Sequence, residues 1–231
     1  MSGSSTTPVE ARASASVIVL RSGKQGPELL YLLRNPALKF HGDYWVFPGG
    51  RIDDADYSTG TPNERDEEHA AACAAAREAR EEAGIEVRPS QLVFAIHWTT
   101  PTANPIRFAT WFFVAETQAD TVEVDGEEIH DFRWLTPSDA LRRHARGAIK
   151  LAAPTFALTT RFAAFPSVSA ALSAVAEWPR ERLMGRVYDV EGGRVVTYAQ
   201  DRAYETGELD EAGSRHRLWM VAGGWRYERS F

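Results

Sequence analysis

The chain has 231 residues, of which 44% are hydrophobic and 25% charged, the balance of an ordinary globular protein with one large domain or one domain and a smaller annex. Its net charge of −6 argues against a general electrostatic grip on nucleic acid, and its single cysteine, Cys73, excludes an intramolecular disulfide and a cysteine-based metal site. The sequence has no apolar run of membrane-spanning length and no secretory signal, so we expect a cytoplasmic protein, with residues 1–13 disordered.

The first predicted elements are two strands and a helix. Apolar runs at 14–21 and 28–34 flank the turn-like segment SGKQGP and indicate a strand pair. The aromatic segment YWVFPGG follows and ends at a Pro-Gly-Gly stop. After a polar stretch, the Ala-rich segment HAAACAAAREAREEAG predicts a helix from 66 to 83, with Gly84 as its left-handed C-terminal cap.

Three further strands and a helix are predicted next. Segments rich in Val, Phe, Trp and Thr at 91–100 and 107–116 indicate two strands, and a third follows at 130–135. Thr136 is a suitable cap for a helix over about 137–144.

The C-terminal part combines helical and β patterns. Residues 154–178 predict two short helices, interrupted at the sequence FPS. Residues 183–231 contain two Gly-Gly pairs flanked by β-type residues, which indicates two hairpins that form an annex or an interface.

The end of the predicted 66–83 helix, with the sequence REAREEAGI, gathers Glu78, Glu81 and Glu82 within five residues. Side chains three and four apart are helical neighbours, so these carboxylates repel one another and also oppose the helix macrodipole. Two interpretations are open: a solvated helix end, or a site for a divalent cation. Carboxylate ligands without His or Cys favour Mg²⁺ or Mn²⁺ over zinc.

REAREEAGI, preceded by Phe-Pro-Gly-Gly, resembles the Nudix box of Nudix hydrolases, whose pattern is G-x5-E-x7-R-E-U-x-E-E-x-G-U with U a bulky apolar residue. Arg77, the three glutamates, Gly84 and Ile85 all match the second half of this pattern, and Ala79 is smaller than the apolar residue expected.

The first half of the box departs from the pattern. The family spacing places fourteen positions between the glycine and the arginine, whereas Gly50 and Arg77 are 77 − 50 = 27 apart, which indicates an insertion of 27 − 14 = 13 residues. The box glutamate is then either replaced by Asp56 or absent. A long insertion here resembles the branch of the family that includes the peroxisomal coenzyme A diphosphatase, and segments between about 29 and 142 resemble that branch too.

The resemblance implies an α/β (α+β) fold, a Nudix-type αβα sandwich with a mixed sheet, over residues 14–150. We expect residues 151–231 to add C-terminal helices and a β-hairpin annex packed on it. The hairpins are open to two interpretations, a cover over the pocket or a homodimer contact.

The resemblance also implies roles for the residues of the box. Glu78 and Glu82 are the expected ligands of Mg²⁺ or Mn²⁺, with Glu81 as an additional ligand or an outer partner and the carbonyl of Gly50 as a backbone ligand. Arg77, four residues before Glu81, is expected to hold that carboxylate in place.

A further catalytic carboxylate is expected from a distant loop, where the sequence DGEEIHDFRW offers Glu127 and Glu128. We prefer Glu128, because its spacing to Trp134 matches the resembling branch, although a solvated turn is an equal alternative for both. For substrate binding, the candidates are Arg51 and Arg107 for phosphates and four aromatic residues for a base or an apolar slot, although such aromatic residues more often belong to the core: Trp45, Phe47, Trp98 and Trp111. Arg34 is expected to be a surface charge.

Two functional classes follow. The leading one is a hydrolase of a nucleoside diphosphate linked to another moiety, with coenzyme A or acyl-coenzyme A as the first substrate and ADP-ribose, dinucleotides or nucleotide sugars as competitors. The other is a Nudix-fold module that binds such a ligand without turnover.

Overall fold

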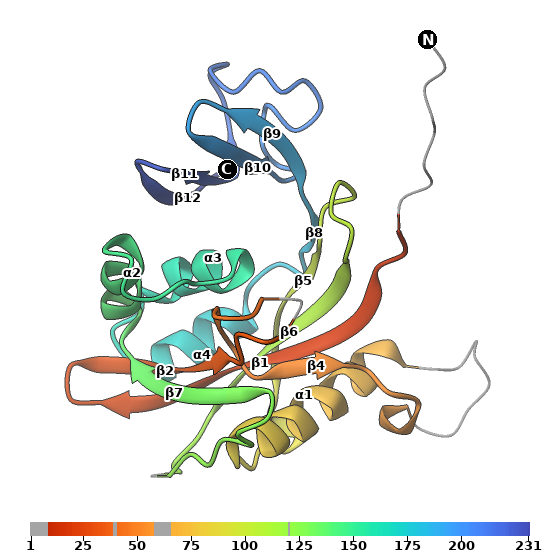
Figure 1. Ribbon diagram of the computed structural model, residues 1–231, viewed down its shortest axis with the longest axis vertical. Coiled ribbons are helices and arrows are strands. Elements are labelled where there is room, and N and C mark those ends of the chain that lie inside the picture. The colour runs from red at the N-terminus through yellow and green to blue at the C-terminus, as the bar shows by residue number, and fades with distance from the viewer. Residues whose placement is uncertain (1–8, 39–40, 58–65, 120) are drawn as a thin grey trace. The chain divides into compact units, whose positions relative to one another are not determined.

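The computed structural model describes residues 9–38, 41–57, 66–119 and 121–231 (Figure 1). The chain divides into two compact units. The larger contains Ser14–His97 and Thr110–Glu181, and the smaller contains Met1–Ala13, Trp98–Ala109 and Arg182–Phe231. Disorder was predicted for residues 1–13. Of these, residues 1–8 lie outside the described residues, whereas Arg12 and Ala13 belong to the first strand.

The described residues form one eight-stranded sheet with the order β3-β2-β1-β6-β5-β8, in which β4 also pairs with β1 and β7 with β2. The β1 strand is antiparallel to β2 and β4, and β2 is antiparallel to β3 and β7. The strands are β1 (Arg12–Gly23), β2 (Gly26–Arg34), β3 (Trp45–Val46), β4 (Gly49–Arg51), β5 (Val93–Thr99), β6 (Phe108–Glu116), β7 (Ile129–Leu135) and β8 (Arg182–Met184).

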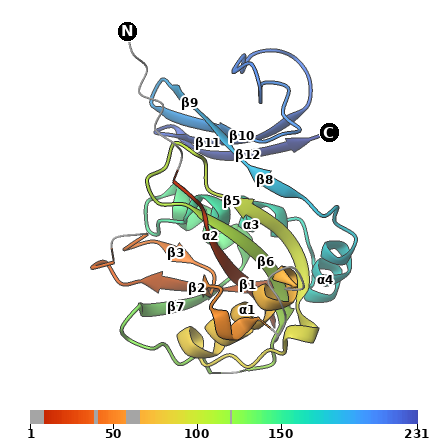
Figure 2. The same ribbon diagram turned by 90° about the vertical axis from the view of Figure 1, so that its right-hand side faces the viewer.

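Helices cover both faces of the sheet in the larger unit. Helix α1 (Glu67–Ala83) lies against one face, and α2 (Pro137–Ala145), α3 (Ala153–Phe162) and α4 (Val168–Ala176) lie on the other (Figures 1 and 2). Two 3₁₀ turns complete the unit, η1 (Asp54–Asp56) and η2 (Pro89–Gln91). The arrangement is an αβα sandwich, which confirms the predicted fold class.

Helix α1 begins and ends where its sequence predicts. The Asp66 carboxylate accepts hydrogen bonds from the backbone N–H groups of Glu68 and His69, and Gly84 ends the helix in the left-handed region with φ 64°. Its alanines are buried against apolar side chains of the sheet, including Val17, Leu30, Leu32, Trp111 and Phe113. Alanine allows the helix backbone to approach the sheet closely, which fixes the position of the glutamates at its end.

The opposite face is joined to α3 by a buried polar contact. The hydroxyl groups of Tyr31 on β2 and Thr159 on α3 are 2.9 Å apart, and both side chains are fully buried. The Tyr31 ring also packs against Phe47, with ring centroids 5.5 Å apart. A buried phenol needs such a partner, so this pair fixes α3 on the sheet.

The smaller unit contains a second, four-stranded antiparallel sheet with the order β12-β11-β10-β9. Its strands are β9 (Arg186–Val190), β10 (Gly193–Thr197), β11 (Arg215–Val221) and β12 (Gly224–Ser230). The two predicted hairpins therefore exist and join into one sheet. The Arg217 guanidinium is buried beside this sheet and donates to the Asp201 carboxylate at 2.7 and 2.5 Å.

None of the helices in the described part of the chain combines the length and the apolarity that crossing a bilayer requires.

Candidate active site

The carboxylates at the end of α1 lie directly against the Gly-Gly pair of β4. The backbone N–H of Gly49 donates to Glu82 Oε2 at 2.9 Å. A Cβ atom on Gly50 would lie 2.2 Å from Glu78 Oε1, so only glycine leaves room for this carboxylate. Strand β4 is itself held by β1, through the pairs Ser14 with Arg51 and Ala15 with Gly50. The sheet thus fixes the backbone against which the helix carboxylates pack.

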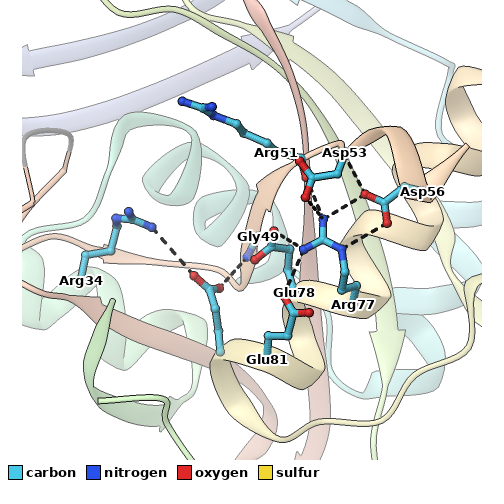
Figure 3. Close-up of polar contacts among 9 residues, drawn as sticks. Arg34, Gly49, Arg51, Asp53, Asp56, Arg77, Glu78 and Glu81 are labelled. Carbon is cyan, nitrogen blue, oxygen red and sulfur yellow. Dashed lines mark hydrogen bonds and ion pairs between the residues drawn. The ribbon is translucent and has the colours of Figure 1, made fainter. Parts of the chain in front are cut away.

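Arg77 connects these carboxylates to the loop after β4 (Figure 3). Its Nη1 donates to Glu78 Oε1 at 2.8 Å and to Glu81 Oε2 at 3.0 Å. Its Nη2 donates to the carbonyl of Arg51 at 3.0 Å. The guanidinium therefore holds Glu81, as the sequence predicts, and Glu78 as well.

Asp56 also binds the Arg77 guanidinium. The Asp56 carboxylate accepts from Nε at 3.2 Å and from Nη2 at 2.9 Å, and it also accepts from the backbone N–H of Asp53 at 2.8 Å. Asp56 is only 8% exposed, and its hydrogen bonds raise the pKa of Arg77. The position six residues after Gly50 thus carries an acidic residue that contacts the box arginine, which favours replacement of the box glutamate over its absence.

Burial sets the electrostatics of the two inner glutamates. Glu82 is 4% exposed, and burial raises its pKa to about 8, against the lowering effect of the Gly49 N–H. Burial also raises the pKa of Glu78, against the lowering effect of the hydrogen bond from Arg77. Both carboxyl groups therefore have less positive charge around them than their ionised forms need, a deficit that a divalent cation relieves.

The oxygen donors suit a hard cation, although they are not arranged as a complete coordination site. No three His, Cys, Asp or Glu side chains within the described ranges converge on one point to form a metal site. Arg77 and Arg34 pair with these carboxylates and offset part of their charge. The oxygen atoms are nevertheless those that Mg²⁺ and Mn²⁺ prefer, on glutamate side chains with three rotatable bonds each.

Arg34 is a site residue that the sequence-based expectation of a surface charge missed. It ends β2, its side chain is 18% exposed, and its guanidinium lies 3.9 Å from Glu82 Oε1 and 3.4 Å from Glu128 Oε2. No local motif signals this role, because Glu128 is 94 residues away in the sequence and reaches Arg34 only through the pairing of β2 with β7.

Glu128, the preferred distant carboxylate, lies within the electrostatic range of the helix glutamates. Its charge contributes to raising the pKa of both Glu78 and Glu82. Its own side chain is 61% exposed, so it remains accessible to a ligand. The neighbouring Glu127 is fixed through its backbone carbonyl, which accepts from Asn35 Nδ2 at 2.7 Å.

The predicted substrate-binding residues have diverse positions. Arg51 is exposed, and its guanidinium points away from the carboxylates (Figure 3). Arg107 is 8% exposed and donates to the carbonyls of Val9 and Thr100, which connects two segments of the smaller unit. The four aromatic candidates are only 3–5% exposed, so they lie in the core, which was one of the two positions predicted for them: Trp45, Phe47, Trp98 and Trp111.

The NUDIX domain family model matches residues 10–154. The chain belongs to this family. It is therefore a Nudix-type diphosphate hydrolase, and Nudix hydrolases generally use divalent metal ions. The family match includes β4, α1 and the loop that carries Glu128, which together form the candidate active site.

The chain also aligns with solved structures, and the first of these supports the same fold. A NUDIX hydrolase from Alicyclobacillus acidocaldarius aligns with a TM-score of 0.64 at 23% identity, over 74% of this chain and 99% of that chain. The NUDIX domain of Shewanella oneidensis NrtR complexed with ADP ribose aligns with a TM-score of 0.49 at 13% identity, over 66% of this chain and 86% of that chain. A C. elegans Ap4A hydrolase aligns with a TM-score of 0.43 at 25% identity, over 66% of this chain and 96% of that chain. No curated protein matches the sequence.

Proposed function

We propose that this Nudix protein hydrolyses a nucleoside diphosphate linked to another moiety, with coenzyme A or acyl-coenzyme A as its substrate class. The observation that carries the reaction type is the cluster of Glu78, Glu81 and Glu82, held by Arg77 against the Gly-Gly backbone of β4. Carboxylates held together against their mutual repulsion serve a cation that binds a diphosphate, whereas a module that only binds ligand has no chemical need for all of them.

Each residue of the site has a proposed part in this reaction. Glu78, Glu82 and the carbonyl of Gly50 would hold Mg²⁺ or Mn²⁺, with Glu81 as a further ligand or an outer partner. When bound, the cation neutralises the diphosphate oxygens and lowers the pKa of water. Arg77 keeps the glutamates oriented through its bonds to Glu78 and Glu81.

Glu128 is the proposed general base. Its exposed carboxylate accepts a proton from the attacking water as the new O–P bond forms and the P–O bond between the two phosphates breaks. The products are two molecules that each end in a phosphate. Arg51, exposed beside Gly50, is the proposed phosphate contact, and Arg107 and the buried aromatic residues are assigned here to packing.

The choice of coenzyme A rests on sequence resemblance. The long insertion between Gly50 and Arg77, and the segments around it, resemble the branch of the family that includes the peroxisomal coenzyme A diphosphatase. The competing substrates are ADP-ribose, dinucleotides and nucleotide sugars, which share the diphosphate and differ in the group attached to it. Fold alone does not select among them, because the pocket is built from loops that vary on a common scaffold.

A substrate panel tests the proposal. Coenzyme A, acyl-coenzyme A, ADP-ribose, NADH and nucleotide sugars are incubated with Mg²⁺ or Mn²⁺, and the products are identified by mass, with Glu82→Gln as the control. We expect a 3′,5′-bisphosphate nucleotide and phosphopantetheine from coenzyme A, and a loss of about 10²-fold or more in the control. Equal turnover by Glu82→Gln would remove the metal assignment. A ligand that raises the melting temperature without being cleaved would instead identify a binding module.

The homodimer remains one of two predictions for the C-terminal hairpins. Light scattering of the full chain measures the mass directly, and a mass near 25.7 kDa, that of one chain, would exclude the dimer.

A further inference from the structure

The turn that carries Glu128 is built around one side chain, that of Asp125. Asp125 Oδ1 accepts three backbone hydrogen bonds, from the N–H of Glu127 at 2.6 Å, of Glu128 at 2.8 Å and of Ile129 at 3.1 Å. An aspartate carboxylate accepts such bonds more strongly than a neutral oxygen because it is charged. A single carboxylate oxygen thus binds the N–H groups of Glu128 and of the residues on both sides of it.

Asn35 fixes the same turn from the neighbouring strand. Its Nδ2 donates to the carbonyl of Glu127 at 2.7 Å, and its backbone N–H donates to the carbonyl of Glu128 at 2.8 Å. The pairing of β2 with β7 shifts register between Leu33 and Arg34, so Arg34 lies opposite Ile129. The shift places the turn beside the last residue of β2.

This fixed backbone brings the Glu128 side chain to the site. Its carboxylate lies 3.4 Å from the Arg34 guanidinium, which lies 3.9 Å from Glu82 at the end of α1. Six backbone or side-chain hydrogen bonds, including one from the N–H of Gly126 to the carbonyl of Ile129 at 3.1 Å, thus hold a turn whose two glutamates are both exposed. Burial does not hold these exposed residues in place, so the hydrogen bonds hold the backbone of the turn, and the ion pair with Arg34 orients the Glu128 carboxylate.

We propose that Asp125 is a positioning residue of the hydrolase, which presents Glu128 to the carboxylates of α1 by holding the backbone of the 125–129 turn. The inference rests on the proposed role of Glu128 as the base. Asp125 itself touches no reacting atom in this assignment and acts only through Glu128. A base must lie within hydrogen-bonding reach of the proton that it takes, and a misplacement of about 1 Å can lower a rate by about 10²-fold.

Four variants of the full chain test the proposal with coenzyme A and Mg²⁺, or with ADP-ribose where coenzyme A is inert. They are Asp125→Ala, Asp125→Asn, Glu128→Gln and the double variant Asp125→Ala/Glu128→Gln. Asp131→Ala is the matched control, because Asp131 is an exposed aspartate of the adjacent strand that accepts from its neighbour Phe132 at 2.9 Å. Thermal unfolding of each variant verifies that it is folded under the assay conditions.

Asp125→Ala is expected to lower kcat about tenfold or more, with KM changed by less than about threefold, because substrate contacts remain. Asp125→Asn keeps an acceptor oxygen and is expected to recover most of the rate. The double variant should be no slower than Glu128→Gln alone, since Asp125 has nothing to position once the base is lost. Asp131→Ala should match the wild type.

Three outcomes would overturn the proposal. The first is that Asp125→Ala keeps the kcat of the wild type while Glu128→Gln is slow. The second is that the losses of kcat in the two single variants multiply in the double variant. The third is a wild-type rate for Glu128→Gln, which removes the base that Asp125 would position. Glu82→Gln, measured in parallel, separates this failure from a failure of the proposed function: an inactive Glu82→Gln leaves metal-dependent hydrolysis intact as the function, whereas an active one contradicts it as well.

Discussion

Arg77 donates two hydrogen bonds to the buried carboxylate of Asp56, from Nε at 3.2 Å and from Nη2 at 2.9 Å. The pair joins the loop after β4 to the helix that carries the proposed metal ligands. Because Arg77 also holds Glu78 and Glu81, a disturbance at Asp56 is transmitted to the carboxylates without any direct contact.

We therefore expect Asp56→Asn to reduce kcat about tenfold and to lower the free energy of unfolding by about 1–3 kcal/mol, since a half-buried guanidinium loses its charged acceptor. Steady-state kinetics and urea unfolding measure the two effects. Asp53→Asn is the control, because the Asp53 carboxylate is 65% exposed and 3.7 Å from Arg77. If Asp56→Asn kept the kcat and the free energy of unfolding of the wild type, Arg77 would orient the glutamates without help from the loop.

Gly50 offers a steric test of the site. The Cβ of Gly50→Ala would lie 2.2 Å from Glu78 Oε1, so the carboxylate must move. We expect kcat to fall by about 10²-fold, as for other small displacements of a catalytic group. Gly223→Ala is the control, because a Cβ there meets nothing within 4 Å. Full activity of Gly50→Ala would mean that Glu78 functions from a different position.

Arg34 is expected to compete with the cation for Glu82. Its guanidinium lies 3.9 Å from Glu82 Oε1, so Arg34→Ala should lower the Mn²⁺ concentration that gives half-maximal activity. At the same time kcat should fall about tenfold, because Glu128 loses its ion pair with Arg34. Metal titrations of activity separate the two effects. Arg133→Ala is the control, because Arg133 is half-buried and pairs with Asp131 at 3.9 Å, away from the glutamates of α1. An increased requirement for Mn²⁺ in Arg34→Ala would contradict the competition.

The smaller unit should unfold with acid through Asp201. Burial acts to raise the pKa of Asp201, but the hydrogen bonds from Arg217 and from the backbone outweigh it and hold the pKa below its usual value. A carboxyl with a lowered pKa in the folded state stabilises the protein above its unfolded pKa, and this stabilisation is lost as the pH falls through the folded pKa. Asp201→Asn should therefore be less stable than the wild type at neutral pH, with the difference shrinking below about pH 4. Melting curves followed by circular dichroism check this, and a difference independent of pH would refute it.

Local signals in the sequence predicted the framework well. Helix α1 runs from Glu67 to Ala83 because alanine favours helix, Asp66 caps its start and Gly84 ends it, and each of these signals lies within the segment itself. The carboxylate cluster was visible for the same reason, since helical spacing alone places Glu78 and Glu82 on one face.

The remaining features depend on contacts between distant segments. Arg34 reaches Glu128 through a register shift between β2 and β7 that no residue near Arg34 reveals. Likewise, a strand pattern shows that Trp45 and Trp98 alternate with their neighbours without showing which face is covered, so it cannot separate a core aromatic from one that lines a pocket. The union of the two C-terminal hairpins into one sheet also requires the pairing of β10 with β11, whose partners lie across a long connection.

The contact between Asp56 and Arg77 also has a use in protein engineering. It joins the loop after β4 directly to α1 by side-chain hydrogen bonds, between Asp56 and a helix that starts after the Asp66 cap. The length of the chain between these two points is thereby uncoupled from the spacing of the glutamates. An epitope or a labelled peptide inserted into the sequence between Tyr57 and Asp66 should therefore leave hydrolysis unchanged. This position would allow a reporter to be attached close in sequence to the candidate active site.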